Sequence, residues 1–243
     1  MDAIAIIPAR LASTRLPRKV LREIAGKPML GWVYEAARRS PLLRDVIVAT
    51  DSEEVLETCH RLGIRALVTS AAHRSGTERV HELAQVIKAD VYLNIQGDEP
   101  LTRPEHIETL VGLMRNTEVQ VGTLKTPAAA HDINNPNAVK VITDLGRRAL
   151  YFSRSTIPFD RDRSSETRYF KHLGMYAYRK PALDRFVTLP ESELERSERL
   201  EQLRFLENGI AIHVAETPFD TIGVDTEDDL RRVEQILMAG SHR

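Results

Sequence analysis

Ile4-Ala-Ile-Ile-Pro-Ala-Arg-Leu-Ala-Ser-Thr-Arg-Leu-Pro-Arg-Lys19 is the stretch of sequence that decides the fold. Its apolar start, residues 3–7, is too short for a helix and is uninterrupted, which predicts a strand covered on both faces. Pro8 lacks the N–H that a strand ladder uses, so we expect a loop to begin there. Four cations follow within ten residues, at positions 10, 15, 18 and 19. Their charge, with small residues between them, indicates a loop that binds the phosphates of a nucleotide.

The alternative interpretation of this cluster is a solvated surface loop, which is common for single arginines and lysines. The four cations together repel one another unless an anion is bound. The whole chain is nearly neutral, with 34 basic and 35 acidic residues. A local cluster on a neutral protein favours a ligand site over general nucleic-acid binding, which needs a wider basic surface.

Length and composition narrow the classes of protein further. A chain of 243 residues with 42% hydrophobic residues can build one α/β domain, or a domain with a small lobe. The only cysteine is Cys59, which excludes a disulfide within the chain and makes a cysteine zinc site implausible, so we expect oxygen ligands. No run approaches the ~20 apolar residues of a membrane span, and no signal-peptide pattern precedes the first strand, so we expect a cytoplasmic location.

Hydrophobic patterns in the first hundred residues alternate between strand and helix. Strands are predicted at 3–7, 45–51, 65–69 and 91–96, and helices at 29–39, between Ser52 and Gly63, and at 77–88. This order predicts a doubly wound, largely parallel α/β sheet, with ligands outside the carboxyl ends of its strands near Pro8, Thr50 and Gln96. The sequence has no Gly-x-Gly-x-x-Gly after the first strand and no Gly-Lys-Ser/Thr loop, which disfavours dinucleotide redox and ordinary ATPase chemistry.

The second half is less regular and predicts a smaller mixed α+β lobe, at about 126–180, inserted in a single domain of residues 1–243. The predicted strands lie at 119–125, 138–143, 149–152, 172–178 and 210–214, and the predicted helices at 104–115, 191–208 and 226–238. A hairpin-like turn is expected at 144–146, and an exposed loop at 160–168.

Seven blocks of sequence together resemble one enzyme family. They are Pro8-Ala-Arg-Leu-Ala-Ser-Thr-Arg-Leu-Pro17, Gly26-Lys-Pro-Met29, Ser75-Gly-Thr-Glu-Arg79, Asn94-Ile-Gln-Gly-Asp-Glu-Pro100, Asn135-Pro-Asn-Ala-Val-Lys140, Leu150-Tyr-Phe-Ser-Arg154 and His172-Leu-Gly-Met-Tyr176. In this order, over nearly the whole chain, they resemble the 3-deoxy-manno-octulosonate (Kdo) cytidylyltransferases. The first block alone is typical of several sugar nucleotidyltransferases. The chain departs from the family pattern at Arg18, where a glycine is usual, and at Arg74, where a glutamine is common.

This resemblance implies a Rossmann-like nucleotide-diphospho-sugar transferase fold. The implied activity is transfer of CMP from CTP to Kdo, with release of pyrophosphate, for lipopolysaccharide biosynthesis. It also implies Mg²⁺ as cofactor and a homodimer. The apolar content of residues 133–157, which is high for an exposed lobe, independently favours a dimer.

Two aspartates are candidate metal ligands. Asp98 follows a predicted strand, and Gly97 before it allows the backbone to approach a ligand closely. Its alternative role is a turn aspartate; Glu99 could replace it as a ligand, but Pro100 directs that side chain elsewhere. Asp225 could instead cap a helix, but Thr226 and the acidic residue three positions later already form a capping-box pattern. The resemblance implies that Asp98 and Asp225 hold Mg²⁺, which prefers carboxylate oxygens, waters and phosphates.

The remaining candidate residues follow from the family blocks. For nucleotide binding they are Pro8, Ala9, Arg10, Ser13, Arg15, Lys19, Arg74, Ser75 and Gly76, with Arg10, Arg15, Lys19 and Asp98 also catalytic. For an acidic sugar they are Arg79, Gln96, Arg154, His172, Tyr176, Glu201 and Gln202. Taken singly, each of the latter has an ordinary structural interpretation as a surface, ion-pair or half-buried residue. His172 and Tyr176 are four positions apart, so on a strand both face the same side.

Three alternatives to the Kdo activity stay open at this point. The acceptor could be a modified Kdo such as its 8-amino form, because only a few pocket residues distinguish the two. Another sugar nucleotidyltransferase of the same fold is the second. A non-catalytic nucleotide or sugar sensor is the third, and it would keep the cationic loop but have no need for Asp98 and Asp225 together.

Overall fold

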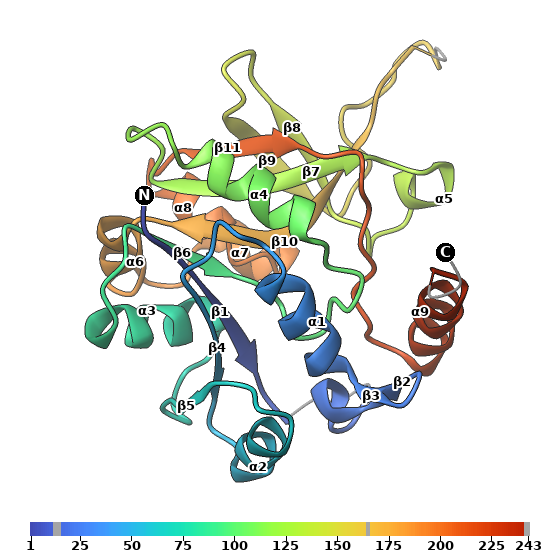
Figure 1. Cartoon of the computed structure of the whole chain (residues 1–243). Helices are drawn as coiled ribbons and strands as arrows, with labels where there is room; N and C mark the ends of the chain where they lie inside the picture. Colours follow the sequence, from blue (N-terminus) through green and yellow to red (C-terminus); the bar gives the residue numbers. More distant parts are fainter. Residues whose placement is uncertain (12–15, 164–165, 241–243) are drawn as a thin grey trace. The chain divides into compact units, whose positions relative to one another are not determined.

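The computed structural model describes residues 1–11, 16–163 and 166–240 (Figure 1). It divides into two compact units, one formed by Met1–Glu108 with the segment from Thr221 onward, the other by Thr109–Asp220. The second unit therefore interrupts the first in sequence. It contains the predicted lobe at 126–180 and extends beyond it on both sides.

Four parallel strands form the sheet of the first unit. They are β1 (Ala3–Ala9), β4 (Asp45–Thr50), β5 (Ala66–Val68) and β6 (Val91–Asn94), in the order β6-β1-β4-β5. β1 lies inside this sheet, and six of its seven residues, Ala3 to Ile7 and Ala9, are fully or almost fully buried. The predicted first strand, covered on both faces, is thus confirmed.

The prediction that a loop begins at Pro8 is wrong, because β1 continues through Pro8 to Ala9. Pro8 pairs with Ala49 of β4, and pairing with β6 ends at Ile6, whose carbonyl accepts the N–H of Ile95 at 3.1 Å. Residues 6 and 8 of a strand direct their backbone N–H to the same side, so the missing N–H of Pro8 faces the side where the ladder has already ended.

Helices cover both faces of this sheet. These helices are α1 (Met29–Arg38), α2 (Glu53–Arg61) and α3 (Gly76–Val86), and the first unit also contains α9 (Glu227–Gly240). Leu30 of α1 and Ile7 both approach the same point above Gly97, whereas Gly76 at the start of α3 contacts the ring of Pro8. Successive residues of a strand face opposite ways, so α1 and α3 lie on opposite faces of β1. The predicted doubly wound arrangement is confirmed.

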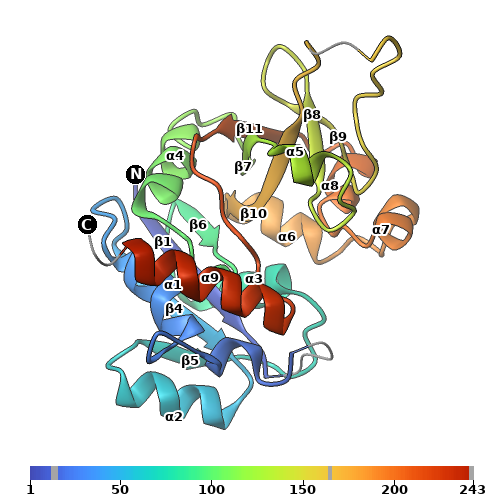
Figure 2. The same cartoon turned by 90° about the vertical axis from the view of Figure 1, so that its right-hand side faces the viewer.

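A separate apolar cluster joins the ends of the first unit. It contains Leu16, Ile24, Met29, Val224, Leu230 and Val233. Around it lie the 3-10 turn η1 (Lys19–Leu21), the short pair β2 (Glu23–Ile24) and β3 (Lys27–Pro28), and α9, which runs beside α1 (Figure 2). Burial of these side chains fixes the last segment of the chain against the segment that follows β1.

The second unit is built on a mixed sheet. Its strands are β7 (Val121–Pro127), β8 (Lys140–Thr143), β9 (Ala149–Ser153), β10 (Phe170–Tyr178) and β11 (Ile212–Glu216), in the order β11-β7-β10-β8-β9. Only β11 and β7 run parallel; the other pairs are antiparallel. The predicted hairpin between β8 and β9 is confirmed. Helix α4 (Pro104–Leu113) confirms the prediction for 104–115, whereas α5 (Ala130–Ile133) and α6 (Lys180–Phe186) are additional.

The single helix predicted at 191–208 is wrong. The segment forms α7 (Glu193–Glu198) and α8 (Leu203–Glu207), separated by Arg199 in a left-handed conformation with φ 54°. Arg204 donates to both oxygens of Glu195, at 2.7 and 2.5 Å, and both side chains are nearly buried. In one straight helix, residues nine apart lie ~13 Å apart along the axis and on opposite faces, so this ion pair requires the break.

Among the described residues, no helix is both long and apolar enough to cross a membrane.

Candidate functional site

The centre of the candidate site is one lysine between two aspartates. The Lys19 ammonium lies 2.5 Å from Oδ2 of Asp98 and 2.9 Å from Oδ1 of Asp225. The three side chains come from the segment after β1, the turn after β6 and the segment before α9. All three lie in the first unit, so the structure brings together three residues that the sequence predicted as catalytic or metal-binding.

The electrostatics of this triad follow from its partial burial. The Lys19 side chain is only 14% exposed, and loss of water lowers its pKa, but the charges and hydrogen bonds of Asp98 and Asp225 outweigh that effect and raise the pKa. Lys19 therefore stays an ammonium ion. Its charge balances one of the two carboxylates, which leaves the group with one net negative charge.

Local backbone structure places the two aspartates. A Cβ on Gly97 would lie 3.1 Å from the carbonyl oxygen of Pro8, so the turn carrying Asp98 is packed tightly against the end of β1. The backbone carbonyl of Asp98 accepts the backbone N–H of Val224 at 2.9 Å. Thr226 and Asp229 cap α9 reciprocally, with Thr226 N to Asp229 Oδ2 at 2.9 Å and Asp229 N to Thr226 Oγ1 at 3.2 Å. The predicted capping box is confirmed, and the Asp225 carboxylate binds Lys19 instead of the helix end.

The donor set fits a hard divalent cation. One atom of Lys19 contacts an oxygen from each carboxylate, so a small ion could also contact both. Among the described residues, no group of three or more His, Cys, Asp or Glu side chains is placed to hold a metal alone. Two carboxylates suffice for Mg²⁺ only where waters and substrate phosphates complete its shell.

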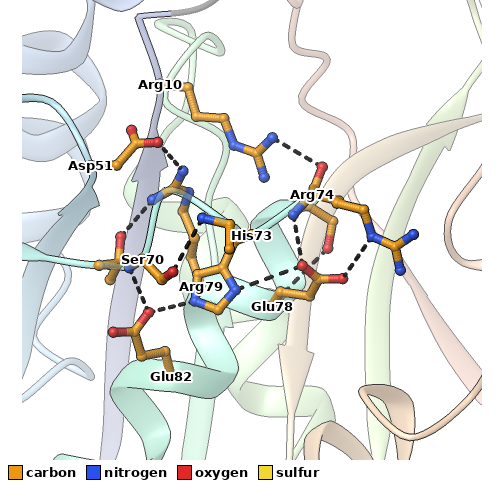
Figure 3. A network of polar contacts seen from close by, with 11 residues as sticks. Arg10, Asp51, Ser70, His73, Arg74, Glu78, Arg79 and Glu82 are labelled. Atoms are coloured by element: carbon orange, nitrogen blue, oxygen red, sulfur yellow. Dashed lines mark hydrogen bonds and ion pairs between the residues drawn. The ribbon is translucent and has the colours of Figure 1, made fainter.

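A second cluster surrounds the start of α3 (Figure 3). The Arg10 guanidinium donates to the carbonyl of Arg74 at 3.0 Å, and the backbone N–H of Arg74 donates to Glu78 at 2.7 Å. Ser75 is the N-cap of α3, where its hydroxyl accepts from the Glu78 N–H at 3.2 Å. Arg10 of the first family block and Ser75 of the third therefore lie together at the carboxyl end of β1.

His73, in the loop before α3, connects this loop to the helix. Its Nδ1 lies 3.7 Å from Glu78, and its Nε2 bonds Glu82 on the next turn of the helix. Glu82 also accepts the backbone N–H of Ser70 at 2.9 Å. The loop that carries Arg74 is thus fastened to α3 at several points, a feature that family blocks alone did not predict.

Arg79 is buried rather than placed on the surface. Its side chain is 0% exposed; it donates to Asp51 at 2.8 Å and to Thr69 at 2.6 Å. Gln96 donates to the side chain of Asn94 at 3.2 Å. Asp51 and Asn94 were not among the predicted site residues, although each stands at the end of a parallel strand, where ligands bind in such sheets.

The second unit holds an aromatic cluster around His172. The rings of His172 and Tyr176 lie 5.5 Å apart, so the two share a face of β10 as predicted, despite the register shift between Leu173 and Tyr176. Phe152 packs edge-on against His172 at 4.9 Å. Nε2 of His172 lies 3.0 Å from the hydroxyl of Thr123. Loss of water in this cluster lowers the pKa of His172 to about 3.

Arg154 is held by backbone carbonyls. Its guanidinium donates to the carbonyls of Glu198 at 2.7 Å and Pro136 at 3.0 Å. The buried Lys140 ammonium donates to the carbonyls of Asn135, Ala138 and Arg154, at 2.8, 2.6 and 2.7 Å. Burial lowers the pKa of Lys140. Lys140, the last residue of the block at 135–140, therefore connects this block to Arg154, the last residue of the block at 150–154.

Glu201 and Gln202 lie in the turn between α7 and α8. Gln202 is buried, and its Nε2 has no hydrogen-bond partner among the described residues. Arg79 and Gln96 belong to the first unit, whereas Arg154, His172, Tyr176, Glu201 and Gln202 belong to the second. Their joint role in acceptor binding stays a prediction. Ser13 and Arg15 lie outside the described residues.

We predict that His172 makes the stability of the protein depend on pH. Its pKa is near 3 in the folded state and ~6.5 when unfolded, so only the unfolded state gains a proton as the pH falls. The stability is complete above pH ~6.5 and declines below it, by about 1.3 kcal/mol between pH 7.5 and pH 5.5. Urea unfolding at the two pH values should show this decline, and His172→Gln should reduce it by that amount.

His60→Gln is the matched control, because His60 is exposed near the end of α2. It should leave the pH dependence of unfolding unchanged. A decline as large in His172→Gln as in the wild-type protein would contradict the prediction.

Comparison with known proteins identifies the family. The sequence model of the family "Cytidylyltransferase" matches residues 4–212. The chain is 69% identical to the 3-deoxy-manno-octulosonate cytidylyltransferase of Koribacter versatilis, over 98% of this chain and 90% of that protein. It is 60% identical to the enzyme of the same name from Acidobacterium capsulatum, over 98% and 97%.

A solved structure gives the same result for the fold. CMP:2-keto-3-deoxy-manno-octonic acid synthetase, in complex with CTP, superimposes with a TM-score of 0.94 at 42% sequence identity, over 99% of this chain and all of that one. The predicted α/β fold with a mostly parallel mixed sheet is confirmed. From its motifs, its fold and these relatives, the chain belongs to the 3-deoxy-manno-octulosonate cytidylyltransferase family.

Proposed function

We propose that this protein transfers CMP from CTP to the anomeric hydroxyl of Kdo, giving CMP-Kdo and pyrophosphate for lipopolysaccharide biosynthesis. One observation carries the proposal: Asp98 and Asp225 face a single point beside the end of β1, in a chain whose relatives are named for this reaction. A protein that only sensed a nucleotide would have no use for two carboxylates held together at this point.

The reaction needs no covalent enzyme intermediate. The acceptor hydroxyl attacks the α-phosphorus of CTP in line and gives its proton to solvent, the bond to the β-phosphate bridging oxygen breaks, and pyrophosphate leaves. Arg10 and Lys19, with Arg15, stabilise the charge that develops on the phosphates. The loop of Arg74 to Gly76 positions the nucleotide against the end of β1. Orientation and electrostatics supply most of the rate enhancement in such a site.

We further propose Mg²⁺ as the cofactor, held by Asp98 and Asp225. A bound Mg²⁺ polarises phosphate oxygens and neutralises the leaving group. The hard oxygens of the two carboxylates fit this ion. Asp98 and Asp225 also fix the position of Lys19, which can then bind phosphate when the nucleotide arrives.

For the acceptor we propose recognition of a carboxylate and several hydroxyls. The proposed residues are Arg79, Gln96, Arg154, His172, Tyr176, Glu201 and Gln202. The Nε2 of Gln202, which has no partner among the described residues, supports this, because a buried donor without a partner costs free energy unless a ligand satisfies it. Neutral His172, with its lowered pKa, can accept or donate one hydrogen bond to a hydroxyl. The cytoplasmic location predicted from the sequence stays a prediction.

A substrate panel tests the proposed function. Pyrophosphate release is measured with four nucleoside triphosphates, each combined with Kdo, 8-amino-Kdo, a neutral hexose or a hexose 1-phosphate. We expect release with CTP, Kdo and Mg²⁺, little with UTP and almost none with ATP or GTP. Discrimination against acceptors without a carboxylate should reach ~10⁴-fold, because donors built for that group are left unpaired.

Two outcomes of the panel would change the proposal in different ways. If a hexose 1-phosphate reacted faster with UTP or GTP than Kdo reacts with CTP, the proposed function would be wrong, although the description of the fold would be unaffected. Faster reaction of 8-amino-Kdo would change the acceptor only.

Replacing either metal-binding aspartate should reduce turnover. Asp98→Asn and Asp225→Asn each remove a charge that holds the metal in the transition state, so we expect kcat to fall by on the order of 10² or more. Steady-state pyrophosphate release at limiting Mg²⁺ measures the effect. Asp184→Asn is the control, since Asp184 pairs with Lys180 on α6 and its side chain is 47% exposed. Unchanged activity in one of the two site variants would remove that residue from the site.

We propose a homodimer that uses the β8–β9 hairpin. Leu145 in its turn and Leu150 on β9 are 107% and 59% exposed, more than an isolated lobe in water favours. Light scattering at micromolar concentration should give twice the chain mass. Leu145→Glu with Leu150→Glu should give the monomer, whereas Val86→Glu, at an exposed position of the first unit, should not. A wild-type monomer would contradict the dimer.

A further inference from the structure

Lys19 has two partners that the proposed chemistry assigns to a metal. Its ammonium lies 2.5 Å from Asp98 and 2.9 Å from Asp225, and the side chain is only 14% exposed. The Lys19 ammonium thus occupies the position in which a cation contacts both carboxylates.

We propose that Lys19 occupies the metal position of the nucleotide-free enzyme, so that a divalent cation enters only after a nucleotide triphosphate has drawn the ammonium onto its phosphates. The inference rests on the proposed function, because it assumes that Asp98 and Asp225 bind the metal. It adds an order of binding: the nucleotide precedes the metal that acts on it.

The physical reason is competition between like charges. A free divalent cation that approached the two carboxylates would meet the Lys19 ammonium within contact distance of both, and the two cations repel one another strongly at such separations. To bind, the metal must break both ion pairs of Lys19 and leave a largely buried ammonium without a partner. An uncompensated buried charge is strongly unfavourable.

A triphosphate removes this obstacle because it offers the ammonium a new partner. Lysine is suited to such an exchange: it is a compact point charge on a flexible four-carbon stem, so its head can move while its backbone stays fixed. The backbone at Lys19 is indeed fixed, since the residue begins η1 and the Leu21 N–H donates to the Arg18 carbonyl at 2.9 Å. The exchange needs a swing of one side chain and no rearrangement of the fold.

The competing explanation is a purely structural ion pair. Lys19 would then fasten the last segment of the chain to the segment after β1, and its removal would lower stability without opening a metal site. The two explanations differ in one measurable property, which is the affinity of the nucleotide-free protein for a divalent cation.

Manganese binding without nucleotide tests this property. Mn²⁺ is titrated into the full-length protein and the free ion is followed by electron paramagnetic resonance, for the wild type and for Lys19→Met. We expect weak binding to the wild type and at least tenfold tighter binding to Lys19→Met. Lys19→Gln, which keeps hydrogen-bond donors but not the charge, should behave like Lys19→Met and serves if the methionine variant does not fold. Lys19→Arg keeps the charge and should bind as weakly as the wild type.

Matched variants test whether the tighter Mn²⁺ binding of Lys19→Met occurs at Asp98 and Asp225. Lys27→Met removes another lysine of the first unit, one paired with Glu35 at 2.6 Å, and should leave Mn²⁺ binding unchanged. Adding Asp98→Asn to Lys19→Met should abolish the gained site. Calorimetric titration with CTP in excess EDTA tests whether the nucleotide binds before the metal. The wild type should bind CTP without metal, and Lys19→Met should bind it at least tenfold more weakly.

The results separate this inference from the proposed function. Equal Mn²⁺ affinity of the wild type and both uncharged variants would overturn the inference, and so would CTP binding in EDTA that does not depend on Lys19. The pyrophosphate panel decides the function independently, because an enzyme that binds its metal first would still react with CTP and Kdo.

Discussion

The ion pairs of Lys19 are the interaction on which the site depends. They join three segments that are 79 and 206 residues apart in sequence: the chain after β1, the turn after β6 and the approach to α9. The apolar cluster that contains Leu16, Met29 and Leu230 packs these segments together. Hydrophobic burial therefore brings the segments together, and the charges set their register. A lysine with 14% exposure persists at this place only because two carboxylates satisfy it.

The parallel sheet explains why the other candidate residues of the first unit lie nearby. Strands that run in one direction deliver their following loops to one edge, and β1, β4 and β6 deliver Arg10, Asp51 and Asp98 there. The loop before α3 approaches this edge from the side, and Arg10 fastens it through the carbonyl of Arg74. Arg10 is thus held by a backbone carbonyl, and the loop that supplies this carbonyl is held in turn by the carboxylate of Glu78 on α3.

The sequence predicted what local patterns encode. The buried first strand, the alternating helices and the capping box that releases Asp225 all follow from spacing within a few residues. Long-range pairs were not predictable in this way. The break at Arg199 exists because Glu195 must meet Arg204, and the burial of Arg79 depends on Asp51 and Thr69. The strand extends past Pro8 because β6 has already ended there. Each error arose where a tertiary partner overrode a local preference.

Arg18 shows how far the site constrains its own backbone. Its φ of 57° lies in the left-handed region, where a non-glycine residue costs roughly 1–2 kcal/mol. Arg18 recovers part of that energy through an ion pair with Glu54, but both side chains are well exposed, and such pairs contribute little. The turn is therefore imposed from outside, by the burial of Leu16 and Val20 around it and by the two bonds of Lys19. The backbone strain at Arg18 is therefore compensated by interactions of its neighbours. This indicates that the fold maintains the position of the Lys19 ammonium, at the cost of a less favourable backbone conformation in the preceding residue.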